Sequence, residues 1–225
     1  MKNSLSFFYF PFLFFAGCVD TKEADIYFLI DGSTSIGKED FGQIKTFMLG
    51  VIDMFSIGPD KVRVGAVQYS DKKEVEFDIH TYTNDVDLRQ AVLNIDQLEG
   101  RTTTGAALDF ILPIIREGRK HRSSEVPCHL IVLTDGMSED SVLEPAERIR
   151  AEQITIHAIG IGAANKTQLL QIAGKEERVN FGQNFDSLES IKKEVVQSIC
   201  MDKGKQDKKG FIFCPSLVAD FSALH

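Results

Sequence analysis

The sequence contains no Gly-X-Y period among its 17 glycines, so it encodes no collagen triple helix. It also has no excess of positive charge. The formal net charge is −8, which argues against binding to nucleic acid or to anionic membranes, because basic surface drives both. Tryptophan is absent, and the 4 cysteines are too few for a disulfide scaffold. What is present, 43% hydrophobic and 26% charged residues over 225 positions, is typical of a globular protein with a substantial core.

The apolar run near the N-terminus is about half as long as the roughly 20 residues that a membrane-spanning helix needs. It extends from Leu5 to Phe15, follows Lys2 and precedes two small residues at positions 16 and 17. This layout is typical of a secretory signal peptide, which we predict over residues 1–19. We therefore expect a secreted protein with no membrane span.

The last 25 positions, residues 201–225, differ from the rest of the chain. They hold a cluster of lysines followed by a short apolar piece, and they are too few to form a domain. We predict that they form a disordered tail. Residues 20–200 therefore carry one domain and, with it, the function.

Apolar runs and helical periodicity alternate within this domain. Short apolar runs predict strands at residues 24–30, 62–69, 75–79, 129–134, 154–161 and 179–181. Apolar residues at three- and four-residue spacing predict helices at residues 41–55, 85–95, 105–115, 141–151, 167–173 and 186–199. Pro113 should kink its helix or weaken its last turn, and Ser141 with Glu144 should form a capping box.

The order of these elements implies an α/β fold with a doubly wound, mostly parallel sheet and helices on both faces, in the Rossmann-like manner. The runs at 62–69 and 75–79 are separated by a short polar turn, so they should pair as a hairpin. That hairpin supplies one antiparallel edge strand. Ligand sites in such sheets lie at the carboxyl ends of the parallel strands.

Polar side chains follow the predicted strands at these carboxyl ends. Asp31 ends the first strand and is followed by Ser33 and Ser35, a threonine run at 102–104 precedes a helix, and Asp135 follows the strand at 129–134. Carboxylate and hydroxyl oxygens suit Mg²⁺, Mn²⁺ or Ca²⁺ and suit Zn²⁺ or Cu²⁺ poorly. Two carboxylates roughly neutralise a divalent ion and leave a coordination position for an acidic group of a partner.

These three segments resemble the von Willebrand factor type A domain and its metal-ion-dependent adhesion site. DGSTS fits D-x-S-x-S, TTTGAAL fits the threonine loop, and LIVLTDG fits the second aspartate strand. The resemblance implies that Ser33, Ser35 and Thr102 ligate the metal directly, whereas Asp31 and Asp135 act directly or through water. Mg²⁺ is the ion it favours, with Mn²⁺ or Ca²⁺ as alternatives. Thr104 is a weaker candidate, because the adjacent threonines blur the register.

Individual sequence segments are similar to those of the N-terminal type A domains of the collagen VI long chains, for example KVRVGAVQYSD and AIGIGAANKTQLLQIAG. The resemblance implies a non-enzymatic adhesion module of the extracellular matrix. Its partners would be matrix or cell-surface proteins that present an acidic residue, or other type A domains. The alternative is a structural assembly module whose contacts need no metal. An enzyme is disfavoured because neither G-x-S-x-G nor a phosphate loop is present.

Three further features carry predictions of their own. Cys18 and Cys200 bracket the domain and could form a disulfide, whereas Cys128 should be a packed free thiol. Asn165 begins the sole glycosylation sequon, Asn-Lys-Thr, in a predicted loop. The basic run at 116–122 should be a solvated helix end, with a sulfated-glycan patch as the alternative.

Overall fold

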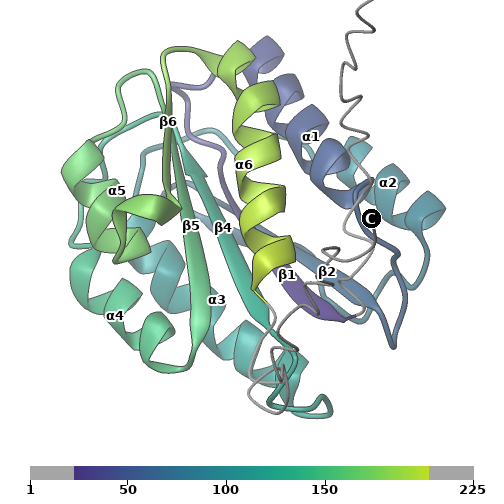
Figure 1. Ribbon diagram of the computed structural model, residues 1–225. Helices are drawn as coiled ribbons and strands as arrows, with labels where there is room; N and C mark the ends of the chain where they lie inside the picture. The colour runs from purple at the N-terminus through teal and green to yellow at the C-terminus, as the bar shows by residue number, and fades with distance from the viewer. Residues whose placement is uncertain (1–22, 203–225) are drawn as a thin grey trace, which may run out of the picture.

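The computed structural model describes residues 23–202. The predicted signal peptide, Cys18 and all but the first two positions of the predicted tail lie outside these residues. The described part holds a six-stranded sheet in the order β3-β2-β1-β4-β5-β6, in which β3 alone runs antiparallel to its neighbour (Figure 1). The strands are β1 (Ala24–Asp31), β2 (Val62–Tyr69), β3 (Lys73–Phe77), β4 (Cys128–Thr134), β5 (Ile154–Ile161) and β6 (Val179–Gly182). The predicted fold class is therefore confirmed, with β3 as the antiparallel edge strand.

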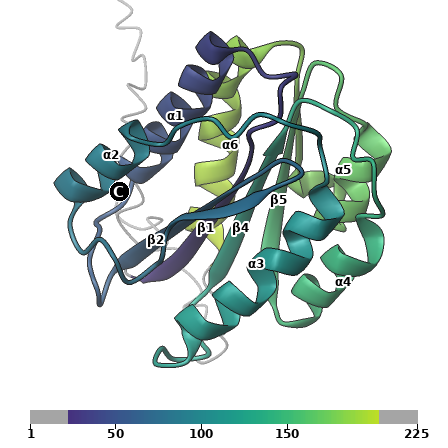
Figure 2. The same ribbon diagram turned by 180° about the vertical axis from the view of Figure 1, so that it is seen from behind.

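Helices cover both faces of the sheet (Figures 1 and 2). One apolar cluster joins one face of the sheet to α1, α2 and α6, and a second joins the other face to α3, α4 and α5. The helices are α1 (Lys38–Ile52), α2 (Asp85–Leu93), α3 (Thr104–Arg119), α4 (Leu143–Ala151), α5 (Lys166–Ala173) and α6 (Leu188–Met201). Among residues 23–202, none of these helices combines the length and apolarity needed to cross a membrane.

The central strand β1 shows why the apolar runs predict the sheet correctly. All eight of its residues are buried, because parallel strands that are covered by helices on both faces have no solvent side. Alternate side chains enter opposite layers: Phe28 packs in the cluster with α1 and α6, and Leu29 packs in the cluster with α3 and α4. This strand ends at Asp31, so burial extends to the first candidate metal ligand.

Two local predictions differ from the structure. The helix α3 ends at Arg119 and not at residue 115, because Pro113 lies on the exposed side while Ile111 and Ile115 are buried and hold the helix against the sheet. A kink at Pro113 stays a prediction. The predicted capping box is wrong. The N-cap of α4 is Val142 without a side-chain cap, and the Ser141 hydroxyl instead donates to the Glu144 carboxylate at 2.6 Å.

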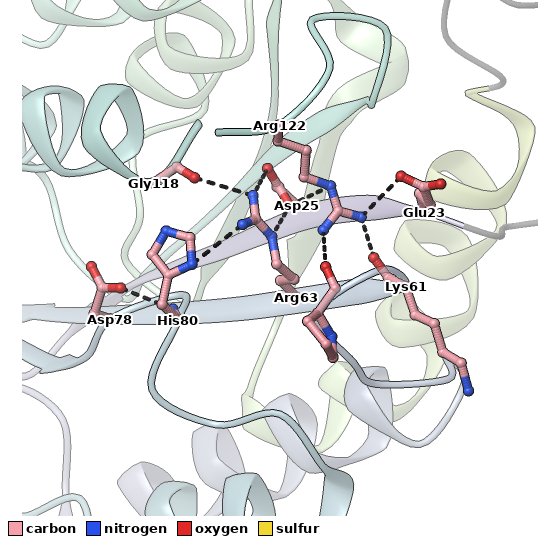
Figure 3. A network of polar contacts seen from close by, with 9 residues as sticks. Glu23, Asp25, Lys61, Arg63, Asp78, His80, Gly118 and Arg122 are labelled. Atoms are coloured by element: carbon pink, nitrogen blue, oxygen red, sulfur yellow. Dashed lines mark hydrogen bonds and ion pairs between the residues drawn. The ribbon is translucent and has the colours of Figure 1, made fainter. Parts of the chain in front are cut away.

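Two arginines share one buried carboxylate at the edge where the parallel strands begin (Figure 3). Arg63 donates from Nε and Nη2 to the two carboxylate oxygens of Asp25, at 2.9 and 2.7 Å. The Nε of Arg122 lies 3.6 Å from Asp25 Oδ1, and its guanidinium donates to the carbonyls of Pro59, at 2.9 Å, and Lys61. The expectation that the basic run 116–122 is solvated is therefore wrong for Arg122, whose side chain is only 7% exposed.

Candidate metal centre

The candidate ligands lie at the opposite edge of the sheet, at the carboxyl ends of β1 and β4. These two strands are neighbours and parallel, and the chain leaves them toward opposite sides of the sheet. Such a switch point leaves a crevice between the two loops, where ligands of doubly wound sheets bind. Asp31 is the last residue of β1, and Asp135 follows the last residue of β4 directly.

A chain of hydrogen bonds joins the two aspartates across this crevice. The backbone amide of Ser33 donates to Asp31 Oδ1 at 2.9 Å, and the hydroxyls of Ser33 and Ser35 lie 3.0 Å apart. The Ser35 hydroxyl then donates to Asp135 Oδ1 at 2.8 Å. Four of the five predicted ligands therefore form one contiguous set of oxygen atoms.

Asp31 is fully buried and Asp135 is partly buried, and no positive charge contributes to the pKa shift of either carboxylate. Burial raises the pKa of Asp31 to about 6, although hydrogen bonds from Ser33 and Thr134 oppose the shift. Burial likewise raises the pKa of Asp135. The charged groups that add to these shifts are carboxylates, Asp135 for the first and Asp40 for the second. A buried charge without a partner costs free energy, so the chemistry of this donor set fits a bound cation.

The threonine loop supplies the fifth candidate. The Thr102 hydroxyl lies next to the Asp135 loop. Its oxygen is 3.6 Å from the position that a Cβ atom would take if Gly136 carried a side chain. The Thr104 hydroxyl instead lies 3.1 Å from the Tyr69 hydroxyl and is buried behind the crevice. Thr102 is therefore the better candidate of the two, and its role as a ligand stays a prediction.

Residues 23–202 contain no cluster of three or more His, Cys, Asp or Glu side chains that could hold a metal. The candidate centre therefore depends on two carboxylates supplemented by hydroxyls. Such a set leaves room for water or for an outside carboxylate, since Mg²⁺ requires about six oxygen ligands.

Two side chains that the sequence analysis missed connect the Asp135 loop to α3. The carboxylate of Asp140 accepts from the backbone amides of Gly105 at 2.8 Å and Ala106 at 2.7 Å. The Ser138 hydroxyl accepts from the backbone amide of Thr104 at 2.9 Å. These bonds cap the N-terminus of α3 from outside its own segment, so they fix the threonine loop relative to Asp135. A serine and an aspartate shortly after TDG are the only sequence signal of this cap.

A third missed residue supports the loop that follows β1. The side-chain amide of Gln97 donates to the carbonyls of Ser33 at 3.1 Å and Ile36 at 2.8 Å. Thr34 and Gly100 exchange two more bonds, of 2.8 and 2.9 Å. The segment before the threonine loop therefore holds the DGSTS loop in place.

The structure describes Cys128, Cys200 and the sequon residue Asn165. Cys128 is a buried free thiol, as predicted, and burial raises its pKa to about 12. Cys200 is disulfide-bonded. Since Cys18 lies outside the described residues, the Cys18–Cys200 pair stays a prediction. Asn165 is the N-cap of α5.

Comparison with known proteins gives the family. Residues 25–194 match the von Willebrand factor type A domain. The collagen alpha-5(VI) chain of Mus musculus is 70% identical over 196 residues, which are 87% of this chain and 7% of the collagen chain. Matrilin-1 of Mus musculus is 34% identical over 186 residues, which are 80% of this chain and 37% of matrilin-1. The chain thus spans less than two thirds of the length of these relatives.

Two solved structures share the fold. Proximal thread matrix protein 1 from the mussel byssus, with a zinc occupied MIDAS motif, is 30% identical with a TM-score of 0.73, over 82% of this chain and 47% of that one. The manganese-loaded TRAP protein of Plasmodium vivax is 19% identical with a TM-score of 0.64, over 78% and 74% of the two chains, and this likeness concerns the fold alone. The mussel protein holds zinc at this motif, whereas we expected carboxylate and hydroxyl oxygens to suit zinc poorly. That expectation is too strict for this relative. With its sheet, its two aspartate loops and the match over residues 25–194, the chain belongs to the von Willebrand factor type A domain family.

Proposed function

We propose that this domain is a secreted interaction module of the extracellular matrix that binds protein ligands through a divalent cation. Asp31, Ser33, Ser35, Thr102 and Asp135 would hold the ion. The observation that carries the proposal is the pair of partly or fully buried carboxylates, joined by two serine hydroxyls, whose pKa values burial raises. A divalent cation would balance the charge of these two carboxylates.

The ion would supply an electrophilic centre with one position open to a carboxylate of the partner protein. The chain's own residues set the geometry around it. Thr134 donates to Asp31 Oδ2 at 2.7 Å and so fixes the orientation of that carboxylate. Ser35 does the same for Asp135. We propose Mg²⁺ as the ion, with Mn²⁺ or Ca²⁺ as alternatives; the relative from mussel byssus adds zinc to the ions that deserve testing.

The relatives support the setting of this proposal. Collagen VI chains and matrilin-1 are secreted proteins of the extracellular matrix. We infer the same location for this chain and no catalytic activity. Its partners would be matrix or cell-surface proteins that present an acidic residue, or further type A domains.

The pH dependence of Mg²⁺ stabilisation tests the centre. Without the ion, the pKa of Asp31 in the folded domain is about 6, which is above its usual value. The folded domain therefore keeps this carboxyl protonated at pH values where the unfolded chain has already lost the proton. As a result, the domain loses stability as the pH rises toward 6. About two pKa units correspond to roughly 3 kcal/mol. Mg²⁺ should relieve this penalty. We expect the ion to raise the melting temperature at pH 7–8 and to have little effect near pH 4.5, in thermal scans with and without added Mg²⁺. An increment that is the same at all pH values would contradict the assignment.

A structural assembly module is the second candidate, and one observation favours it. Val86 and Leu93 of α2 are 69% and 52% exposed and lie seven residues apart, on the same side of the helix. Two exposed apolar side chains on one helix face can make contacts that need no metal.

Capture from a matrix extract distinguishes the two functions. The immobilised chain should retain partners in Mg²⁺ and release them in EDTA, and Asp135→Ala should retain none. The double variant Val86→Ser/Leu93→Ser serves as the matched control and should behave like the wild type. Binding that survives EDTA but is lost in the α2 variant would favour the assembly module instead.

A further inference from the structure

The side chain of Asn165 is fixed in orientation by the helix that it caps. Its Oδ1 accepts from the backbone amides of Thr167 at 2.9 Å and Gln168 at 3.1 Å, at the start of α5. The two atoms of a side-chain amide point in different directions, so Nδ2 must face away from the helix. It faces Met137, whose sulfur lies 3.6 Å from it.

Met137 belongs to the loop of the candidate metal centre. It follows Asp135 by two positions, and its side chain is 61% exposed. The next residue, Ser138, forms hydrogen bonds to α5 through both its backbone amide and its backbone carbonyl. The amide of Ser138 donates to Gln168 Oε1 at 2.8 Å, and Gln168 Nε2 donates to the carbonyl of Ser138 at 3.2 Å. The start of α5 and the Asp135 loop are thus held together, with Nδ2 of Asn165 at their junction.

This nitrogen is the acceptor atom of the chain's one glycosylation sequon, Asn165-Lys166-Thr167. We propose that Asn165 carries an N-linked glycan that stands at the rim of the metal centre and restricts which partners can reach the ion. The donor is a lipid-pyrophosphate-linked oligosaccharide. Nδ2 forms a bond to C1 of the first sugar, the bond from C1 to the pyrophosphate oxygen breaks, the amide loses one proton, and the lipid pyrophosphate leaves with the bonding electrons.

The first sugar would contact the side chain of Met137, because Nδ2 of Asn165 faces the sulfur of that residue. Methionine has three rotatable bonds, so this exposed side chain can move aside or pack against the sugar ring. The glycan then extends over the rim beside the Asp135 loop. A narrow loop that carries an acidic residue can still reach the ion, whereas a broad protein surface meets the glycan first. This consequence for partners rests on the proposed function; the position of the glycan does not.

The chain offers a matched pair of variants for the test. Thr167→Ala removes the sequon but keeps Asn165 and its cap, because the cap uses the backbone amide of residue 167. Thr167→Ser keeps the sequon. Asn165→Gln is the poorer choice, since loss of an N-cap costs about 1 kcal/mol and confuses stability with glycosylation. The full chain is secreted from animal cells, and the mass of the peptide around Asn165 is measured before and after enzymatic removal of glycans. We expect a glycan in the wild type and in Thr167→Ser, and none in Thr167→Ala.

Cysteine labelling with maleimides of two sizes then locates the glycan, and this measurement does not depend on the metal. Met137→Cys is made with and without Thr167→Ala, and each protein reacts with a small maleimide or with one that carries a long polyethylene glycol chain. The glycan should slow the large reagent by about an order of magnitude and the small one by less than a factor of two. The same measurement on Ser124→Cys, an exposed position at the opposite edge of the sheet, should show no effect of the glycan. Each rate is corrected with the parent chain that lacks the new cysteine.

Either of two results overturns the proposal. One is an unmodified Asn165 in the secreted wild type. The other is an equal rate for the large reagent at position 137 with and without the glycan. Calorimetry with Mg²⁺ alone is run on the glycosylated and Thr167→Ala proteins, and it should give equal affinities. Absence of Mg²⁺ binding in both would refute the proposed function while leaving the position of the glycan intact.

Discussion

Replacing Asp135 with alanine is expected to lower the affinity of the domain for Mg²⁺ by at least about 100-fold, or roughly 3 kcal/mol. The substitution removes one of the two carboxylates that face the crevice, and it leaves the Ser35 hydroxyl without its acceptor. A single remaining carboxylate leaves most of the charge of a divalent ion unbalanced. Isothermal calorimetry with Mg²⁺ measures the loss directly.

Stability measurements separate this loss from misfolding. The pKa of Asp135 is raised by burial, so its charge opposes folding when no ion is bound. In metal-free buffer the Asp135→Ala domain should therefore melt no earlier than the wild type. Glu139→Ala is the matched control, because Glu139 is an exposed carboxylate of the same loop that pairs with Arg101 at 3.2 Å. Equal Mg²⁺ affinity in the wild type and Asp135→Ala would show that the site assignment is wrong.

The largest loss of stability is expected for Asp25→Ala, at about 3–5 kcal/mol in urea unfolding at neutral pH. Asp25 is the acceptor for Arg63 and lies beside Arg122, and the three side chains are at most 8% exposed. Burial already lowers the pKa of Arg122, despite the charge of Asp25. Without the carboxylate, Arg63 loses the acceptor of its ion pair, and Arg122 keeps as a counter-charge the half-exposed Glu23, 3.5 Å away.

A surface pair provides the control for this effect. Arg89 and Asp53 also form an ion pair, but their side chains are 41% and 50% exposed. Removal of the carboxylate in Asp53→Ala should cost less than about 1 kcal/mol, because exposed pairs contribute little. In Asp25→Ala/Arg63→Met the first loss should be partly recovered, since one uncompensated charge is gone. A loss below about 1 kcal/mol for Asp25→Ala alone would mean that solvent reaches the arginines.

The sheet and the edge at which the candidate ligands lie could be predicted because both depend on local sequence. A strand covered on both faces must be apolar along its length, and the run that ends at Asp31 shows this without any tertiary information. The carboxyl ends of parallel strands meet at one edge, so DGSTS and TDG had to approach each other. The structure places Ser35 and Asp135, which are 100 positions apart in the chain, at 2.8 Å.

The features that the sequence did not reveal depend on partners far along the chain. Arg122 belongs to a basic run, and its burial follows only from the approach of Asp25 and of the loop that contains Pro59. Asp140 caps α3 from 34 positions away, so no capping pattern at the start of that helix could disclose it. The helix persists past Pro113 because its buried face outweighs one missing backbone donor.

Both ends of the described chain lie at the edge opposite the candidate metal centre. Glu23 precedes β1, and Asp202, at the end of α6, accepts from Thr155 near the start of β5 at 3.1 Å. Mechanical tension on a chain that continues from these points would enter the domain at one edge. Strand β1 would resist by shearing its hydrogen-bonded ladders with β2 and β4 together. Helix α6 is packed in the apolar cluster and carries the disulfide-bonded Cys200, so a covalent bond would bear part of the force at this end. The force would therefore be taken up at the edge away from the candidate ligands.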